Sequence, residues 1–288
     1  MAYPTDNVPM NRGTLPASIS QEIWTEAEKK SAVATLARKV ELPGNGVVIP
    51  QILGMPAGEM VAETAAKPVL EPNYDMVELA PKKIAGIMTF SKEFVRDLPK
   101  LYDGIRERAP EIIARGMDAY AFDYALQVSG YGNFHDAAAT ATGTEAYEII
   151  IDGIQAVAAE GYNCNGYAVS PAFHAALLTS LDGNGRPLFF ATANESMADG
   201  VVFGGKVATY AAPEGLSSDL PAVIGGDWSQ AVYGIVEGIK ISFSDQASVY
   251  DGANTLNLWQ RNMVGVLVEA EVALAFNPEA FFANGYTS

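Results

Sequence analysis

Cysteine and histidine are nearly absent from this 288-residue chain, which has one cysteine and two histidines. A single thiol excludes an intrachain disulfide. Cys164 has no adjacent histidine or acid in the sequence, so we interpret it as a structural thiol. His135 and His174 do not have the spacing of metal ligands. The sequence therefore predicts neither a metal site nor a bound cofactor.

Basic residues are scarce too, because 18 lysines and arginines stand against 34 acidic residues, for a net charge of −16. Proteins that bind nucleic acid directly use clustered Lys and Arg to neutralise phosphates, so this balance speaks against that class. No run of 18 apolar residues occurs, whereas a membrane helix needs about 20. Residues 1–6 have neither the basic start nor the apolar core of a signal peptide. We expect a cytosolic chain that does not enter a membrane.

Three glycine-rich phrases do not form nucleotide or calcium sites. Gly130-x-Gly132 lacks the third glycine of a dinucleotide loop and follows an expected helix. The phrase at 203–206 lacks the phosphate-loop pattern, and the one at 182–185 has the wrong spacing for a calcium loop. No nucleophile–base–acid set is recognisable, so an acidic hydrolase is the weakest functional alternative.

Hydrophobic residues make up 49% of the chain and charged residues 18%, which is typical of an ordered globular protein. Its length suggests one large domain or two intertwined ones. Helical spacing of apolar residues predicts helices from residue 18, over 91–129, over 145–160 and after Ser170-Pro171. Short apolar or alternating runs predict strands near 167–169, 206–210, 222–224, 231–236, 239–243 and 256–268. This mixture indicates an α+β fold.

Residues 47–90 are unusual for a compact domain, because they predict a long two-stranded excursion. Short strands are expected at 47–50 and 59–63, a tip at Lys67-Pro68, and an extended return over 76–90. An isolated hairpin is only marginally stable in water. We therefore expect this arm to rest on a neighbouring copy of the chain.

Several short sequence motifs follow one another in a characteristic order. The first two are Val61-Ala62-Glu63 before Lys67-Pro68, and Ser170-Pro171 before His174 and residues 181–186. The next two are Gly225-Gly226-Asp227 before a predicted strand, and Arg261-Asn262-Met263 before Glu269 and residues 273–276. In these phrases and their order, the chain from about residue 18 to 288 resembles the major capsid proteins of tailed double-stranded-DNA phages, which have the Hong Kong 97-type fold.

The resemblance implies an α+β fold with an N-terminal arm, an extended β-hairpin called the E-loop, a long spine helix, and peripheral and axial domains. The implied boundaries are 1–45 for the N-terminal arm and helix, 46–90 for the E-loop, 91–140 for the spine helix and first part of the peripheral domain, 141–236 for the axial domain, 237–271 for peripheral-domain strands, and 272–288 for the return to the axial domain. Only about 17 residues precede the first helix, so a scaffold would be a separate protein.

The function that the resemblance implies is structural rather than enzymatic. Copies of the chain would form the hexamers and pentamers of an icosahedral head that encloses double-stranded DNA, assembled in the host cytoplasm and present in the virion. Its main partner is itself, and a portal, a scaffold, a protease or decoration proteins are further partners. Because an acidic wall repels DNA, filling would need a separate motor. The alternative is an encapsulin-like nanocompartment of the same fold.

Lys67, Asn262 and Glu269 are a candidate set for a self-made isopeptide bond, and the resemblance supports this, because matching lysine, asparagine and glutamate positions play these roles in the cross-linking members of the family. A lysine amine attacks the asparagine carboxamide, ammonia leaves, and the acid handles the protons. With Asn262 and Glu269 on one predicted strand, they are about 23 Å apart at roughly 3.3 Å per residue, and their odd spacing turns them to opposite faces. We therefore expect the three residues to come from different subunits of a lattice. In the structural alternative, Lys67 is a solvated loop residue, Asn262 pairs or caps locally, and Glu269 lies on a solvated face.

Overall fold

The computed structural model describes residues 17–44, 46–54, 58–63, 66–70, 73–95, 98–143, 145–180, 201–210, 220–250 and 254–284. The chain divides into two units. Unit 1 comprises Met1–Glu28, Lys83–Ala114 and Glu237–Glu271, and unit 2 comprises Lys29–Lys82, Arg115–Val236 and Val272–Ser288. Each unit is therefore assembled from segments that lie far apart in the sequence.

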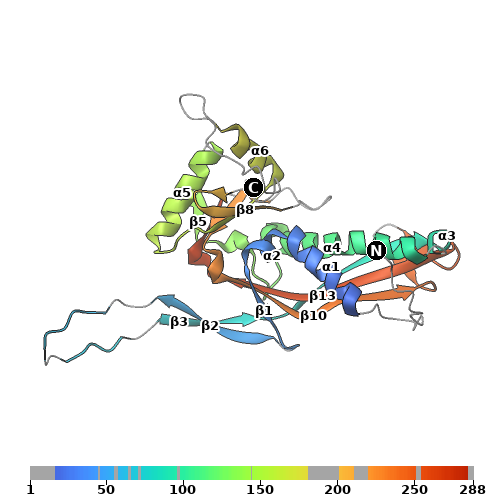
Figure 1. Cartoon of the computed structure of the whole chain (residues 1–288), viewed down its shortest axis with the longest axis horizontal. Helices are drawn as coiled ribbons and strands as arrows, with labels where there is room; N and C mark the ends of the chain where they lie inside the picture. Colours follow the sequence, from blue (N-terminus) through green and yellow to red (C-terminus); the bar gives the residue numbers. More distant parts are fainter. Residues whose placement is uncertain are drawn as a thin grey trace, which may run out of the picture. The chain divides into compact units, whose positions relative to one another are not determined.

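Unit 1 contains most of α1 (Ala17–Lys30), nearly all of β4 (Lys82–Ser91), α3 (Lys92–Val95), the first part of α4 (Leu98–Phe122), the second part of β10 (Ala231–Ser244), β11 (Ser248–Tyr250), β12 (Thr255–Asn257) and the first part of β13 (Met263–Phe276). Of the apolar face expected for the first helix, Ile19, Ile23, Trp24 and Ala27, the last three are buried, and the side chain of Ile19 lies outside the described residues. A Cβ added to Gly86 would lie 2.7 Å from Ile112 Cγ2, so β4 and α4 touch at this glycine. Figure 1 shows α4 running along the strands of this unit.

The long helix is shorter than the sequence predicts, since α4 ends at Phe122 rather than near residue 129. Pro110 lies inside it without ending it. One side chain from beyond the helix caps this end, because the Asn133 amide donates to the carbonyls of Tyr120 (3.1 Å) and Asp123 (2.8 Å). These carbonyls belong to the last turn of α4, where C=O groups have no N–H donor within the helix.

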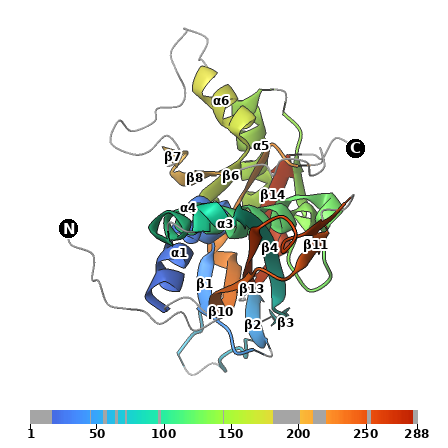
Figure 2. The ribbon, with the colours of Figure 1, turned by 90° about the vertical axis from the view of Figure 1, so that its right-hand side faces the viewer.

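Unit 2 is built on a six-stranded sheet with the order β5-β14-β9-β6-β8-β7. Its strands are β5 (Ala139–Ala141), β6 (Gly166–Val169), β7 (Val201–Val202), β8 (Gly205–Thr209), β9 (Val223–Gly226) and β14 (Phe281–Asn284). Helices α5 (Ala146–Ala159) and α6 (Pro171–Thr179) contact each other beside this sheet (Figure 2). As predicted, Ser170 caps α6, with its Oγ accepting the Phe173 N–H at 3.1 Å.

The core of unit 2 is rich in aromatic rings. Phe282 on β14 lies so close to α5 that a Cβ at Gly153 would be 2.3 Å from its ring. A second cluster surrounds Phe134, whose ring stacks on Phe276 with centroids 4.3 Å apart. The other rings of this cluster, all buried, are Phe122, Tyr210, Trp228 and Phe281. Short 3-10 turns at Phe134–Asp136, Trp228–Gln230 and Pro278–Ala280 hold several of these rings in place.

Two small elements of unit 2 were not predicted, α2 (Ala32–Leu36) and β1 (Arg38–Glu41). Asp118 on α4 anchors the start of α2: its carboxylate accepts the Ser31 hydroxyl at 2.6 Å and the N–H groups of Ala32 at 3.0 Å and Val33 at 3.2 Å. Asp118 is buried, and this burial raises the pKa of its carboxyl to about 6 despite the three hydrogen bonds. Strand β1 then pairs in parallel with β10, from Arg38 opposite Val232 to Glu41 opposite Ile235.

The predicted excursion is a hairpin of two strands, β2 (Val47–Gly54) and β3 (Asn73–Leu79), paired antiparallel from Val47 opposite Leu79. The described parts of the connecting segment lie at its far end (Figure 1). The expected strand at 59–63 is wrong, because these residues are neither helix nor strand and are all exposed. The single extended segment expected over 76–90 is two strands in the structure. Strand β3 ends the hairpin at Leu79, and β4 belongs to the four-stranded sheet β1-β10-β13-β4.

Candidate cross-linking site

The amine of the predicted set lies on the segment that joins β2 to β3. Lys67 and its neighbours Pro68, Val69 and Leu70 are all exposed, and so is every described residue of 58–63. Val69 is 88% exposed and Met60 fully so, which leaves large apolar side chains of this segment in water. We name residues 58–70, as far as they are described, the arm tip. The arm tip is not covered by the chain that carries it.

The carboxamide is not on a strand, which corrects the sequence-based placement. Asn262 is the last residue of a turn at 258–262, and β13 begins at Met263. Its φ of +52° is in the left-handed region, where asparagine is tolerated better than most residues. The argument that Asn262 and Glu269 face opposite sides of one strand therefore does not hold.

The turn is held by a set of hydrogen bonds, and this explains why the strand does not run through it. Buried Leu258 donates its N–H to the Ala247 carbonyl at 3.1 Å and accepts the Met263 N–H at 2.9 Å. The Asn257 side chain accepts the Gln260 N–H at 3.2 Å. The Asn262 carbonyl accepts the Lys92 N–H at 2.7 Å. The Asn262 side chain is thus presented to solvent from a fixed backbone.

The carboxylate lies on β13 as predicted, and it has an ion-pair partner that the sequence did not reveal. Lys83 on β4 places its Nζ 3.6 Å from Glu269 Oε1 and 3.8 Å from Glu271 Oε1. Glu269 and Glu271 are two residues apart and so share one face of the strand. Lys83 was missed because the pairing of β4 with β13 joins positions almost two hundred residues apart.

A second lysine lies close to the asparagine in the chain fold. The backbone of Lys92 bonds to Asn262, and its Nζ is 3.2 Å from Asp245 Oδ2. Lys92 therefore forms an ion pair within the single chain, whereas Lys67 is exposed on the arm tip. Asn262 and Glu269 belong to unit 1 and Lys67 to unit 2.

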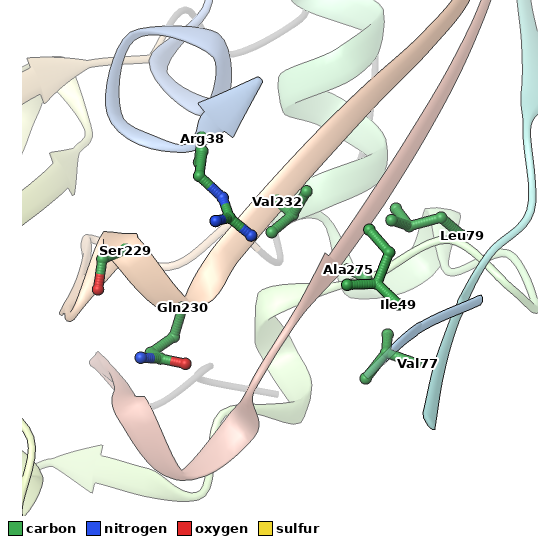
Figure 3. A pocket seen from close by; sticks show the side chains of 8 residues that line it. All are labelled: Arg38, Ile49, Val77, Leu79, Ser229, Gln230, Val232 and Ala275. Carbon is green, nitrogen blue, oxygen red and sulfur yellow. The ribbon is translucent and has the colours of Figure 1, made fainter. Parts of the chain in front are cut away.

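The chain also has a small hollow at the root of the β2–β3 hairpin (Figure 3). Figure 3 shows Arg38, Ser229 and Gln230 on one side and the apolar side chains of Ile49, Val77 and Leu79 on the other, with Val232 and Ala275 completing the lining. None of the lining residues is an acid, a histidine or a cysteine. The hollow therefore offers no acid, base or thiol nucleophile for catalysis.

Two further features are absent from the residues that the structure describes. No group of three His, Cys, Asp or Glu side chains in them is arranged to hold a metal ion. No helix among them is long and apolar enough to cross a membrane.

Comparison with known proteins identifies the class of this fold. A chain in a solved structure from Gordonia phage Cozz superposes with a TM-score of 0.65 at 24% identity, covering 95% of this chain and 92% of that one. The capsid of an empty GTA particle gives 0.60 at 15% identity, covering 100% and 96%. The α+β fold of the Hong Kong 97 type, predicted from the sequence, is thereby confirmed.

The family follows from the sequence comparison. The model of the phage capsid family matches residues 12–283. The probable major capsid protein gp17 of Mycobacterium phage D29 is 30% identical over 290 residues, which cover 95% of this chain and 90% of that protein. The chain belongs to the phage capsid family, as the resemblance indicated. It is a structural protein of a phage capsid, hence of the virion, and not a member of an enzyme family.

Proposed function

We propose that this chain is a major capsid protein that self-assembles into the hexamers and pentamers of an icosahedral head enclosing double-stranded DNA. The observation that carries this proposal is the family match over residues 12–283, because it spans both units rather than one module. The name of the D29 relative and the capsid fold of the GTA particle support it.

The exposed arm tip supports self-association. Monomeric soluble proteins rarely expose contiguous apolar patches larger than a few hundred Å², and larger patches mark interaction sites. Here Met60, Val61, Val69 and Leu70 are exposed on one segment, at the end of a hairpin that is marginal by itself. Covering this segment with a sister copy would remove its apolar surface from water, at roughly 25 cal/mol per Å².

The same proposal includes covalent locking of the shell by Lys67 and Asn262. The neutral Lys67 amine forms a bond from Nζ to Asn262 Cγ, the carboxamide C–N bond breaks, and the nitrogen leaves as ammonia. Glu269 accepts a proton from the attacking amine and passes one to the departing nitrogen. Atoms and charge balance without an oxidant or a nucleotide. With the three residues supplied by different subunits, the reaction would wait for the assembled lattice.

The proposal extends to the other components of a phage head. A chain with a net charge of −16 repels DNA, so the genome would be driven in by a separate motor through a portal. A separate scaffold, a protease or decoration proteins would complete assembly in the host cytoplasm.

Electron microscopy of the purified protein tests the shell, and denaturing gel electrophoresis of mature particles tests the bond. We expect closed icosahedral shells and a ladder of covalent oligomers. The ladder should vanish in Lys67→Arg, which keeps the charge but removes the amine nucleophile, and in Asn262→Gly, which suits the positive φ but removes the carboxamide.

Three outcomes would contradict the proposal. A chain that stays monomeric at high concentration would refute assembly. Expanded wild-type shells that run as a single monomer band would refute the cross-link. Shells purified from infected cells that hold a protein cargo and no DNA would favour an encapsulin-like compartment instead.

A further inference from the structure

The ion pairs beside Glu269 contain more negative charge than their one lysine neutralises. Lys83 Nζ lies 3.6 Å from Glu269 Oε1 and 3.8 Å from Glu271 Oε1, so one ammonium is shared by two carboxylates. The side chains of the two acids are 26% and 38% exposed, and that of Lys83 is 53% exposed. All three residues belong to unit 1, as Asn262 does. We name Lys83, Glu269 and Glu271 the lysine–glutamate group.

The lysine–glutamate group lies on the outer face of its sheet. On β13, Val268 and Ala270 are buried on either side of Glu269. On β4, Ile84 is buried next to Lys83. Because side chains alternate along a strand, the acids and the lysine point away from the core. A partly exposed ion pair contributes little to stability, so the stability of the chain gives little reason for this arrangement.

A carboxylate beside an attacking lysine has two opposite effects on bond formation. It accepts the proton that the amine loses, which the reaction needs. It also favours the charged form of the same lysine, because an opposite charge nearby stabilises the ammonium. An ordinary lysine at pH 7 is neutral in only about one molecule in a few thousand. Two acids without a counter-ion would therefore make the neutral nucleophile scarcer still.

We infer that Lys83 is a positioning residue for the cross-link, which neutralises Glu269 so that this carboxylate acts as a base without holding the incoming Lys67 as an ammonium. This inference rests on the proposed Lys67–Asn262 bond. The ammonium of Lys83 repels a charged amine and not a neutral one, and an adjacent cation is one of the ways in which a lysine is activated as a nucleophile. With Lys83 at Oε1, Oε2 of Glu269 is the oxygen that takes the proton. The bonds formed and broken are those given above, and Lys83 keeps its own protons throughout.

A cation beside a carboxylate also weakens that carboxylate as a base, and the two effects differ in weight. Once the amine has bonded to the carboxamide carbon, its nitrogen is positively charged and is a far stronger acid than free lysine. A weak base therefore suffices to remove its proton. The neutral amine is the scarce partner, so the gain at Lys67 exceeds the loss at Glu269.

Glu271 has the opposite effect to Lys83. It shares the Lys83 ammonium with Glu269 and adds a negative charge of its own to the same face of the strand. Removing the positive charge of Lys83 should therefore slow the bond, and removing the negative charge of Glu271 should speed it. An ion-pair group that only supported the fold would slow the bond in both variants.

The rate at which the covalent ladder appears in assembled shells tests the inference. It is followed by denaturing gel electrophoresis over about pH 6 to 9, where an ordinary lysine changes from almost wholly charged to measurably neutral. Lys83→Met should slow the bond about tenfold at pH 7 and move the rate–pH curve about one pH unit toward alkaline pH, because a neighbouring charge shifts a titration by about one unit or more. Lys83→Arg keeps the charge and cannot attack a carboxamide, so it should restore the rate and exclude Lys83 itself as the nucleophile. Glu271→Gln should be severalfold faster than the wild type at pH 7.

Lys206→Met is the matched control. It removes an exposed lysine from β8 in unit 2, so it changes the net charge as Lys83→Met does and should leave the rate unchanged. Lys240 is exposed on β10, the other neighbour of β13 in the sheet, and it is common to all the variants, so its charge does not enter the comparison.

The outcomes separate this inference from the proposed function. A Lys83→Met ladder that forms at the wild-type rate overturns the role of Lys83 and leaves the proposed bond standing. Lys83→Arg without a ladder overturns it too, because Lys83 then supplies something other than charge. Should Lys83→Met form no shells, Glu271→Gln decides, since a slower ladder in that variant contradicts the inference. A wild type without a ladder at any pH refutes the bond itself and the role of Lys83 with it.

Discussion

Replacing Asp118 by asparagine should change how the stability of the chain depends on pH. The folded chain holds the Asp118 proton more tightly than the unfolded chain, because burial raises the pKa of this carboxyl from 3.8 to about 6. The carboxyl therefore stabilises the fold fully below about pH 4, and this contribution is lost as the pH rises through about 6. At about 1.4 kcal/mol per pKa unit, the whole effect is worth roughly 3 kcal/mol.

Roughly 1.4 kcal/mol of this contribution falls between pH 5 and pH 7.5. Urea unfolding of the unassembled chain, followed by tryptophan fluorescence, measures it. The other titrating groups are common to both proteins, so they cancel in the difference between wild type and Asp118→Asn. We expect the free energy of unfolding of the wild type, relative to the variant, to fall by about that amount over this range.

A second variant tests in which direction the pKa of Asp118 shifts when a hydrogen bond is removed. The Ser31 hydroxyl donates to Asp118 and lowers the pKa of its carboxyl, so Ser31→Ala should move the pH-dependent range upward. It should also cost about 1 kcal/mol at every pH, because Ser31 caps α2 by accepting the Ala34 N–H at 3.2 Å. A wild-type minus Asp118→Asn difference that stays flat from pH 5 to 7.5 would refute the reasoning.

Three further predictions concern packing, reactivity and the proposed bond. Gly153→Ala should destabilise unit 2 by about 1–3 kcal/mol in urea unfolding, because the added methyl group would overlap the Phe282 ring. This loss is expected although alanine has a better helix propensity than glycine. Phe282→Leu should restore part of the lost stability, and a Gly153→Ala variant as stable as the wild type would contradict the prediction. Burial raises the pKa of the Cys164 thiol to about 11, so a maleimide at pH 7 should modify the unfolded chain much faster than the folded one, and equal rates would be the contrary result. Glu269→Gln should leave shells intact but abolish the covalent ladder, and a normal ladder in this variant would show that Glu269 takes no part in the reaction. Lys83→Met should lower the stability by less than about 1 kcal/mol, because the Lys83–Glu269 ion pair is partly exposed.

The sequence predicted well where a structure is decided by residues close together in the chain. The first helix shows its buried face in the spacing of Ile23, Trp24 and Ala27, and α6 shows its start in Ser170 followed by a proline. Both features are read from one helical turn. The hairpin after residue 46 was also expected, from the short apolar runs of residues 47–90. In the structure Gly46, just before β2, has a φ of +79°, a conformation that glycine adopts readily.

Prediction failed where distant groups decide. Asn133 ends α4 from ten residues further along, and Asp118 fixes α2 from 86 residues away. The turn at 258–262 was taken for strand because apolar residues flank it, yet the Ala247 carbonyl and the Lys92 N–H hold its ends. Four successive residues without alternation, Trp259 to Asn262, were the available sign of a turn. Of the reactive set, the sequence supplied the residues but not the Lys83 partner of Glu269.

The two groups of the proposed bond differ in how firmly the single chain holds them. The turn that carries Asn262 is held by hydrogen bonds, whereas the arm tip that carries Lys67 is exposed. The Asn262 backbone is held at its carbonyl by Lys92 and through its turn by Leu258, so the acceptor is in place before any contact is made. The arm tip has no helix or strand in its described parts and exposes every described side chain, so the single chain does not cover these residues. We therefore expect the rate of bond formation to depend on when the arm tip arrives, and not on a rearrangement of the Asn262 turn. Free chains in solution meet briefly and in many orientations, whereas neighbours in a shell hold one orientation. Holding two reacting groups in one orientation is what raises the rate of a reaction between them.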